Sequence, residues 1–115
     1  MATEFDYGQL DGITGGDTEF EREVLDEYLA SAPKDIAKLR AAVAAGDASA
    51  TGASAHALKG ASATIGAKGF AAIALELEQA GKKNDLASAP QALDRLEAEF
   101  AELAVLIRER IARAA

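Results

Sequence analysis

The chain has 115 residues, with 12 basic and 19 acidic side chains, no cysteine and no tryptophan. This length favours one domain spanning residues 1–115. Without cysteine there are no disulfides or thiolate sites, and the net charge of −7 opposes binding to nucleic acid or to an anionic membrane. No apolar stretch approaches the roughly 20 residues that a membrane span needs, and the N-terminus lacks the pattern of a signal peptide, so we expect a cytoplasmic protein.

Helical patterns occupy the first half of the chain. A short helix is expected within residues 3–16. Thr18 and Glu21 match a capping box, so a long helix is predicted from Thr18 until Pro33 interrupts it. Proline suits the first turn of a helix, so a further helix is predicted from Pro33 to a stop at Gly46.

The second half continues the helical pattern. Asp47 is positioned to cap a helix that runs to about Gly66, and the next helix follows and ends within residues 81–84. The last helix begins after Ser88, and its apolar residues alternate steps of three and four. Short connections make consecutive helices pack antiparallel. The sequence therefore predicts an all-α fold, an antiparallel up-down four-helix bundle with a short extra N-terminal helix, which needs no second copy and is expected to be a monomer.

The only histidine of the chain lies in the segment 47–66, which consists mostly of small residues. At helical spacing the neighbours of His56 on its own face, apart from Lys59, are all glycine or alanine: Gly52, Ala53, Gly60 and Ala63. Leu58 and Ile65 lie about 160° and 180° around the helix from that face. They are therefore predicted to enter the core while the imidazole faces solvent.

Glycine inside a helix lowers stability by about 0.5–1 kcal/mol relative to alanine. Two glycines on one helix face, Gly52 and Gly60, therefore indicate that the missing side chains are used. Gly60 leaves the ring of His56 uncovered for another protein or for a bulky group on the ring nitrogen. Lys59 places an ammonium about one helical turn away, where it can neutralise an anion. The alternative is that the small residues let two helices approach closely, which would bury the histidine.

Residues 48–75 contain no aspartate or glutamate, and their only full charges are Lys59 and Lys68. An acid-free surface around the histidine lowers the electrostatic penalty for holding a dianion or for meeting an acidic pocket. We therefore assign a candidate partner-docking face to Gly52, Ala53, Ala63 and Lys68. The simpler interpretation of Lys68 is a solvated side chain, and that of Lys82 and Lys83 is a pair of helix-end charges.

These residues are similar to a known family. The segment from His56 to Ala67, HALKGASATIGA, resembles the signature of histidine-containing phosphotransfer (HPt) domains of bacterial two-component phosphorelays. Leu77-Glu78 matches a pair common in the next helix of that family. The first bundle helix is matched by Phe20, Leu25, Tyr28 and Leu29. The resemblance implies a four-helix bundle whose exposed histidine carries a phosphoryl group between aspartates of receiver domains.

By this resemblance His56 is the phosphoacceptor, Lys59 neutralises the phosphate, and Gly60 provides steric clearance. Glu78 lies where some members have a glutamine that bonds the imidazole, so it is a candidate contact of the ring, with an ordinary surface acid as the alternative. The implied partners are sensor or hybrid histidine kinases and response-regulator receiver domains.

The sequence shows no cluster for Mg²⁺ and no glycine-rich nucleotide loop. We therefore expect no intrinsic cofactor or metal, with Mg²⁺ supplied by the partner receiver domain, and a phosphocarrier rather than an autonomous kinase with an ATP site. A non-catalytic helical adaptor that docks receiver or kinase domains without phosphorylation is the alternative. An enzyme or metalloprotein is disfavoured, because one histidine without cysteine cannot supply a typical metal site.

Overall fold

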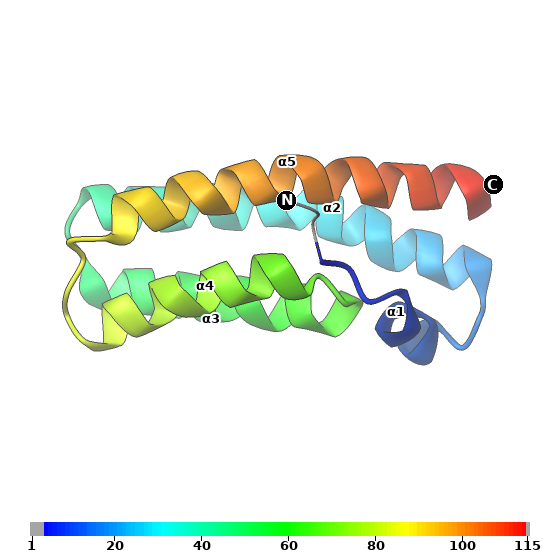
Figure 1. The fold of residues 1–115 in the computed structure, drawn as a ribbon, viewed down its shortest axis with the longest axis horizontal. Coiled ribbons are helices and arrows are strands. Elements are labelled where there is room, and N and C mark those ends of the chain that lie inside the picture. The colour runs from blue at the N-terminus through cyan, green and yellow to red at the C-terminus, as the bar shows by residue number, and fades with distance from the viewer. Residues whose placement is uncertain (1–3, 115) are drawn as a thin grey trace.

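The computed structural model describes the backbone of residues 4–114, which form a bundle of helices (Figure 1). The helices are α1 (Tyr7–Thr14), α2 (Thr18–Ala44), α3 (Ala48–Ile65), α4 (Lys68–Lys82) and α5 (Ala89–Ala114). The four long helices run in alternating directions, and α1 lies across one end of the bundle (Figure 1). The predicted all-α bundle with a short extra N-terminal helix is confirmed.

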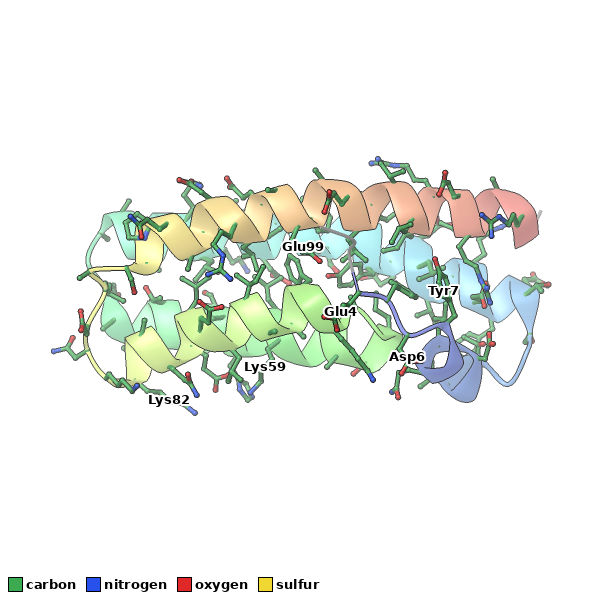
Figure 2. All side chains as sticks on the ribbon, viewed as in Figure 1. Glu4, Asp6, Tyr7, Lys59, Lys82 and Glu99 are labelled. Carbon is green, nitrogen blue, oxygen red and sulfur yellow. The ribbon has the colours of Figure 1, made fainter. Side chains whose placement is uncertain are left out.

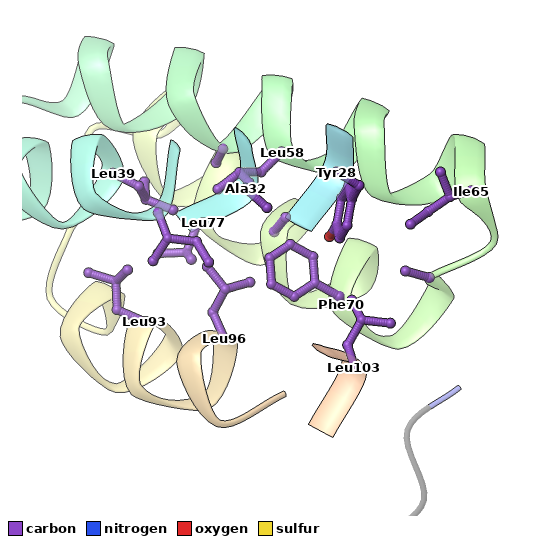
Figure 3. Close-up of a cluster of buried hydrophobic side chains, with 14 of the residues drawn as sticks. Tyr28, Ala32, Leu39, Leu58, Ile65, Phe70, Leu77, Leu93, Leu96 and Leu103 are labelled. Atoms are coloured by element: carbon purple, nitrogen blue, oxygen red, sulfur yellow. The ribbon is translucent and has the colours of Figure 1, made fainter. Parts of the chain in front are cut away.

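Each long helix packs against two others, in the order α2, α3, α4, α5 and back to α2. The contact between α3 and α4 is the most extensive, whereas α1 packs against α2 and α3. Aromatic and aliphatic side chains from all four long helices fill the centre (Figure 3). Leu58, Ile65 and Leu77 are buried, as predicted. Each such side chain contributes about 1.5–3 kcal/mol by leaving water.

The predicted interruption at Pro33 is wrong, because α2 continues through this residue to Ala44. Proline has no N–H to donate and normally weakens a helix interior. Here Pro33 is exposed, while Tyr28, Ala32, Ile36 and Leu39 on either side of it are buried on one face. The burial of that continuous apolar face outweighs the missing hydrogen bond.

The start of α2 also differs from the prediction by one residue. Asp17, not Thr18, is the N-cap, and its carboxylate accepts a hydrogen bond from the Phe20 N–H. Glu21 does not reach back to the cap, because it is buried and bonded to Arg110 of α5. The Asp47 cap of α3 is confirmed, with its carboxylate 3.0 Å from the Ala50 nitrogen.

The turn between α3 and α4 holds the N-terminal segment in place. Asp6 donates its N–H to the Gly66 carbonyl at 2.7 Å, caps α1 through the Gln9 N–H, and pairs with Lys68 at 2.9 Å. Gly66 has φ +96°, and a Cβ there would collide with the Asp6 carbonyl oxygen. Glycine is therefore required at this turn for two reasons, its left-handed backbone and the close approach of the chain.

Candidate functional site

The middle of α3 presents His56 to solvent. Buried residues of α3 lie on the opposite face and attach it to the bundle: Thr51, Ala55, Leu58, Ser62 and Ile65. The helix is therefore oriented by its few larger side chains, and 68% of the His56 side-chain surface remains exposed. The alternative in which close helix packing buries the ring does not describe this structure.

Glu78 of α4 lies beneath the imidazole. Its side chain is only 2% exposed, and its Oε2 is 3.0 Å from His56 Nδ1. An ionised carboxylate can only accept hydrogen bonds, so in the neutral ring Nδ1 carries the proton and its N–H donates a hydrogen bond to Glu78 Oε2. This assignment leaves Nε2 with an unshared electron pair on an exposed ring.

Two lysines hold the buried carboxylate in its ionised form. Lys59 Nζ lies 2.7 Å from Glu78 Oε1, and Lys82 Nζ lies 2.9 Å from Oε2. Figure 2 shows both lysines on the same side of the α3–α4 pair. These two ammonium groups, with His56, lower the pKa of Glu78 to about 2, against the opposing effect of burial. The contribution of this ionised group to folding stability is therefore present above its ordinary pKa of 4.5 and is lost as the pH falls toward 2.

The sequence identified part of this cluster and missed part of it. Glu78 lies at the ring and is not the ordinary surface acid that was the alternative. The interpretation of Lys82 as only a helix-end charge is wrong, because it pairs with Glu78. Their spacing of four residues on one helix was the available signal. Lys59 is beside the ring as predicted, but it is paired with Glu78 instead of standing free.

The small residues around His56 fall into two groups. A Cβ at Gly60 would meet nothing within 4 Å, and Ala53 and Ala63 are exposed, so this part of the face is open. Gly52 is half-buried and faces α4, where a Cβ would lie 3.7 Å from the Glu78 carbonyl oxygen. That is an ordinary contact, and it is the Gly81 position where a Cβ would collide with the Gly52 backbone, so close helix packing, which the sequence offered as the alternative, applies at this point of the face.

Lys68, the remaining residue of the predicted docking face, lies in the first turn of α4 and is paired with Asp6. It is ten residues from Glu78 in the sequence, which is about 15 Å along a helix. The structure therefore does not bring it to the imidazole. Whether the predicted face docks a partner stays a prediction.

A groove of about 720 Å³ lies beside the ring, between α3 and the end of α4. Small residues line most of it, with His56, Glu78 and Lys82 at its polar side. Within residues 4–114 no group of three His, Cys, Asp or Glu side chains is placed to hold a metal ion. None of the helices in that range is long and apolar enough to cross a membrane.

These features, a four-helix bundle with an exposed histidine backed by a buried acid and two lysines, define a helical bundle protein that presents a histidine at its surface. The family model of the Hpt domain matches residues 23–105. The chain therefore belongs to the Hpt domain family, as the sequence resemblance indicated.

Two solved structures are similar to this chain. One is the histidine-containing phosphotransfer protein B (HptB) of Pseudomonas aeruginosa PAO1, with 29% identity, a TM-score of 0.91 and 98% of each chain covered. The other is the HPT domain of a sensor hybrid histidine kinase from Shewanella, with 18% identity and a TM-score of 0.79. That match covers 95% of this chain and 94% of the other, and it supports the fold. No curated protein sequence gives a significant match.

Proposed function

We propose that His56 accepts a phosphoryl group at Nε2 from a phospho-aspartyl receiver domain and passes it to an aspartate of a response regulator. One observation carries this proposal: Nδ1 is bonded to a buried carboxylate while the rest of the ring is exposed. This arrangement fixes which nitrogen carries the proton and leaves the other one free to act as a nucleophile.

The transfer step follows from this arrangement. The electron pair of Nε2 attacks phosphorus, an N–P bond forms, and the P–O bond to the donor aspartate breaks, so the electron pair leaves with its carboxylate. The ring, which still carries the proton on Nδ1, becomes cationic. The anionic Glu78 stabilises that cation. In the onward transfer a carboxylate oxygen of the acceptor aspartate attacks phosphorus, a P–O bond forms, the N–P bond breaks and its electron pair returns to Nε2, which restores the neutral ring.

Lys59 and Lys82 supply the positive charge that a phosphoryl group requires. Both ammonium groups lie at the Glu78 carboxylate, one hydrogen bond away from the ring. We propose that they turn from Glu78 toward the phosphoryl oxygens when His56 is modified. Mg²⁺ and the acidic pocket come from the receiver domain in this proposal, so the chain is a phosphocarrier and not a kinase.

Labelling with phosphate tests the proposed function. The purified protein is incubated with a phosphorylated receiver domain or with acetyl phosphate, and its intact mass is measured. We expect one acid-labile phosphate in the wild-type protein and none in His56→Gln, with nearly the same thermal unfolding because the ring is exposed. Labelling that survives in His56→Gln would contradict the proposal. Receiver binding without any labelling would instead support the adaptor function.

A further inference from the structure

The backbones of α3 and α4 come unusually close one helical turn away from the His56–Glu78 pair. Gly52 lies four residues before His56, and Gly81 lies three residues after Glu78. A Cβ at Gly81 would be 2.5 Å from the Gly52 nitrogen and 2.6 Å from the Ala48 carbonyl oxygen. Both are backbone atoms, so no side-chain rotation can make room. Gly81 is the residue that permits this crossing.

Helix α4 ends within residues 81–84, as predicted, and Gly81 is not its last residue. Gly81 belongs to α4, which continues to Lys82, and Asn84, two residues beyond, adopts the left-handed conformation with φ +54°. Gly81 is also buried. Since its backbone is not left-handed, the requirement for glycine is the close approach of α3 alone.

We propose that Gly81 is a positioning residue for His56, because its crossing with Gly52 sets the separation of α3 and α4 at which Glu78 reaches Nδ1. An ordinary carbon contact is about 3.5–4.0 Å, so a methyl group at residue 81 must push the two backbones apart by about 1 Å. The Nδ1–Oε2 distance is 3.0 Å, and a contact longer than about 3.5 Å is no longer a hydrogen bond. A side chain at residue 81 that separates the helices in this way, which we call a wedge, would therefore break the hydrogen bond between His56 Nδ1 and Glu78.

This inference rests on the proposed function, because the position of the ring matters for phosphotransfer. Its first measurement, the tautomer of His56, does not require phosphate. His56 is the only histidine of the chain, so ¹⁵N shifts of an untagged, histidine-labelled protein report its tautomer directly. The charged groups of α3 and α4 at the ring are Lys59, Glu78 and Lys82. Between α2 and α3, Asp35 and Lys38 of α2 line a pocket with Ala53 and Ala57. All variants keep these groups, so spectra are compared at one pH at which the ring is neutral.

The two glycines provide a matched pair of variants. Gly81→Ala and Gly52→Ala make the same chemical change in a helix. A Cβ at residue 52, however, meets its nearest neighbour at 3.7 Å, which is an ordinary contact. We expect Gly52→Ala to keep the proton on Nδ1. Gly81→Ala is expected to give a mixture of tautomers and labelling slowed about 10- to 100-fold, the cost of misplacing a reacting group by about 1 Å.

Two further variants keep the test decisive. A Cβ at residue 52 would already contact the backbone of Glu78 and Gly81, so the larger side chain of Gly52→Val is a second way to separate α3 from α4 if Gly81→Ala fails to fold. Leu103→Ala weakens the core on α5 and is expected to lower thermal stability without changing the tautomer. The proposal is overturned if a folded wedge variant keeps the proton on Nδ1 with wild-type labelling, or if Leu103→Ala shifts the tautomer equally. If the wedge variants shift the tautomer but the wild-type protein is never labelled, the positioning role of Gly81 is supported. The proposed phosphotransfer by His56 is then rejected.

Discussion

At the scale of single residues, Glu78 has two separable roles at His56. It accepts a hydrogen bond from Nδ1–H and it supplies a negative charge beside the ring. Glu78→Gln keeps an acceptor oxygen but removes the charge, so we expect labelling within a few-fold of wild type. Glu78→Ala removes both roles and is expected to slow labelling about tenfold or more, because a hydrogen bond to a charged group contributes about 1.5–3 kcal/mol. The initial rate of labelling by a phosphorylated receiver domain measures this, and equal rates in all three proteins would contradict the tautomer argument.

The two lysines make a second prediction at this scale. Lys59→Ala and Lys82→Ala should each slow labelling about 3- to 10-fold without stopping it, since each removes one cation from the proposed phosphoryl site at a cost of about 1 kcal/mol. Lys83→Ala is the matched control, because Lys83 follows Lys82 in the sequence and is not among the cations paired with Glu78. The initial labelling rate is measured at low ionic strength. Slowing by Lys83→Ala as large as that by Lys82→Ala would show a general charge effect instead of a local one.

The sequence predicted neighbours within one helix better than contacts between helices. His56 and Lys59 are separated by three residues in one helix, so their proximity follows from helical spacing. Glu78 and Lys82 come from another helix, and their distance from the ring depends on how closely α3 and α4 pack. That separation depends on Gly52 and Gly81 meeting across the interface. No local pattern encodes this pairing, so Gly52 was assigned to a docking face and Gly81 to a helix end.

At the scale of elements, α2 shows how tertiary packing overrides a local signal. Its apolar positions continue through residue 33 with helical spacing, and the bundle buries them on both sides of the proline. The capping and stop signals at Asp47, Gly46 and Gly66 predicted helix ends correctly, because those signals act through neighbouring backbone groups. Pro33 is a weaker signal, because a helix can continue past a proline when packing compensates for the lost hydrogen bond.

Pro33→Ala tests this balance. We expect it to raise the free energy of unfolding by about 1–3 kcal/mol, because alanine restores an N–H donor in the helix interior. The gain is reduced by the greater freedom of the unfolded chain without proline. Pro90→Ala is the matched control, since Pro90 lies in the first turn of α5, where no intrahelical donor is needed. Urea denaturation measures both changes. A loss of stability in Pro33→Ala would show that the proline shape itself fits the bundle.

At the scale of the whole molecule, α2 and α5 are joined by two arginine–glutamate pairs of different burial. Arg110 binds Glu21 through two hydrogen bonds of 2.9 Å, the Glu21 side chain is 6% exposed, and Asp11 of α1 adds a third contact. Arg40 binds Glu97 near the other end, where the two side chains are 48% and 42% exposed. Glu21 and Arg110 are 89 residues apart in the sequence, so only the folded chain brings them together.

Arg110→Met should therefore destabilise the protein far more than Arg40→Met. The first substitution leaves a buried carboxylate without its cation, at a cost of about 1–3 kcal/mol, whereas an exposed pair contributes about 0–1 kcal/mol. The pH dependence has a definite sign. Arg110 lowers the pKa of Glu21 below its ordinary 4.5, so the stability that this pair contributes is present above pH 4.5 and is lost as the pH falls through the lowered value. The stability difference between wild type and Arg110→Met should accordingly shrink in acid, while that of Arg40→Met stays small throughout. Thermal unfolding at pH 7 and at pH values below 4.5 measures both differences. If the stability difference between wild type and Arg110→Met grows in acid, Glu21 is not the group that Arg110 stabilises.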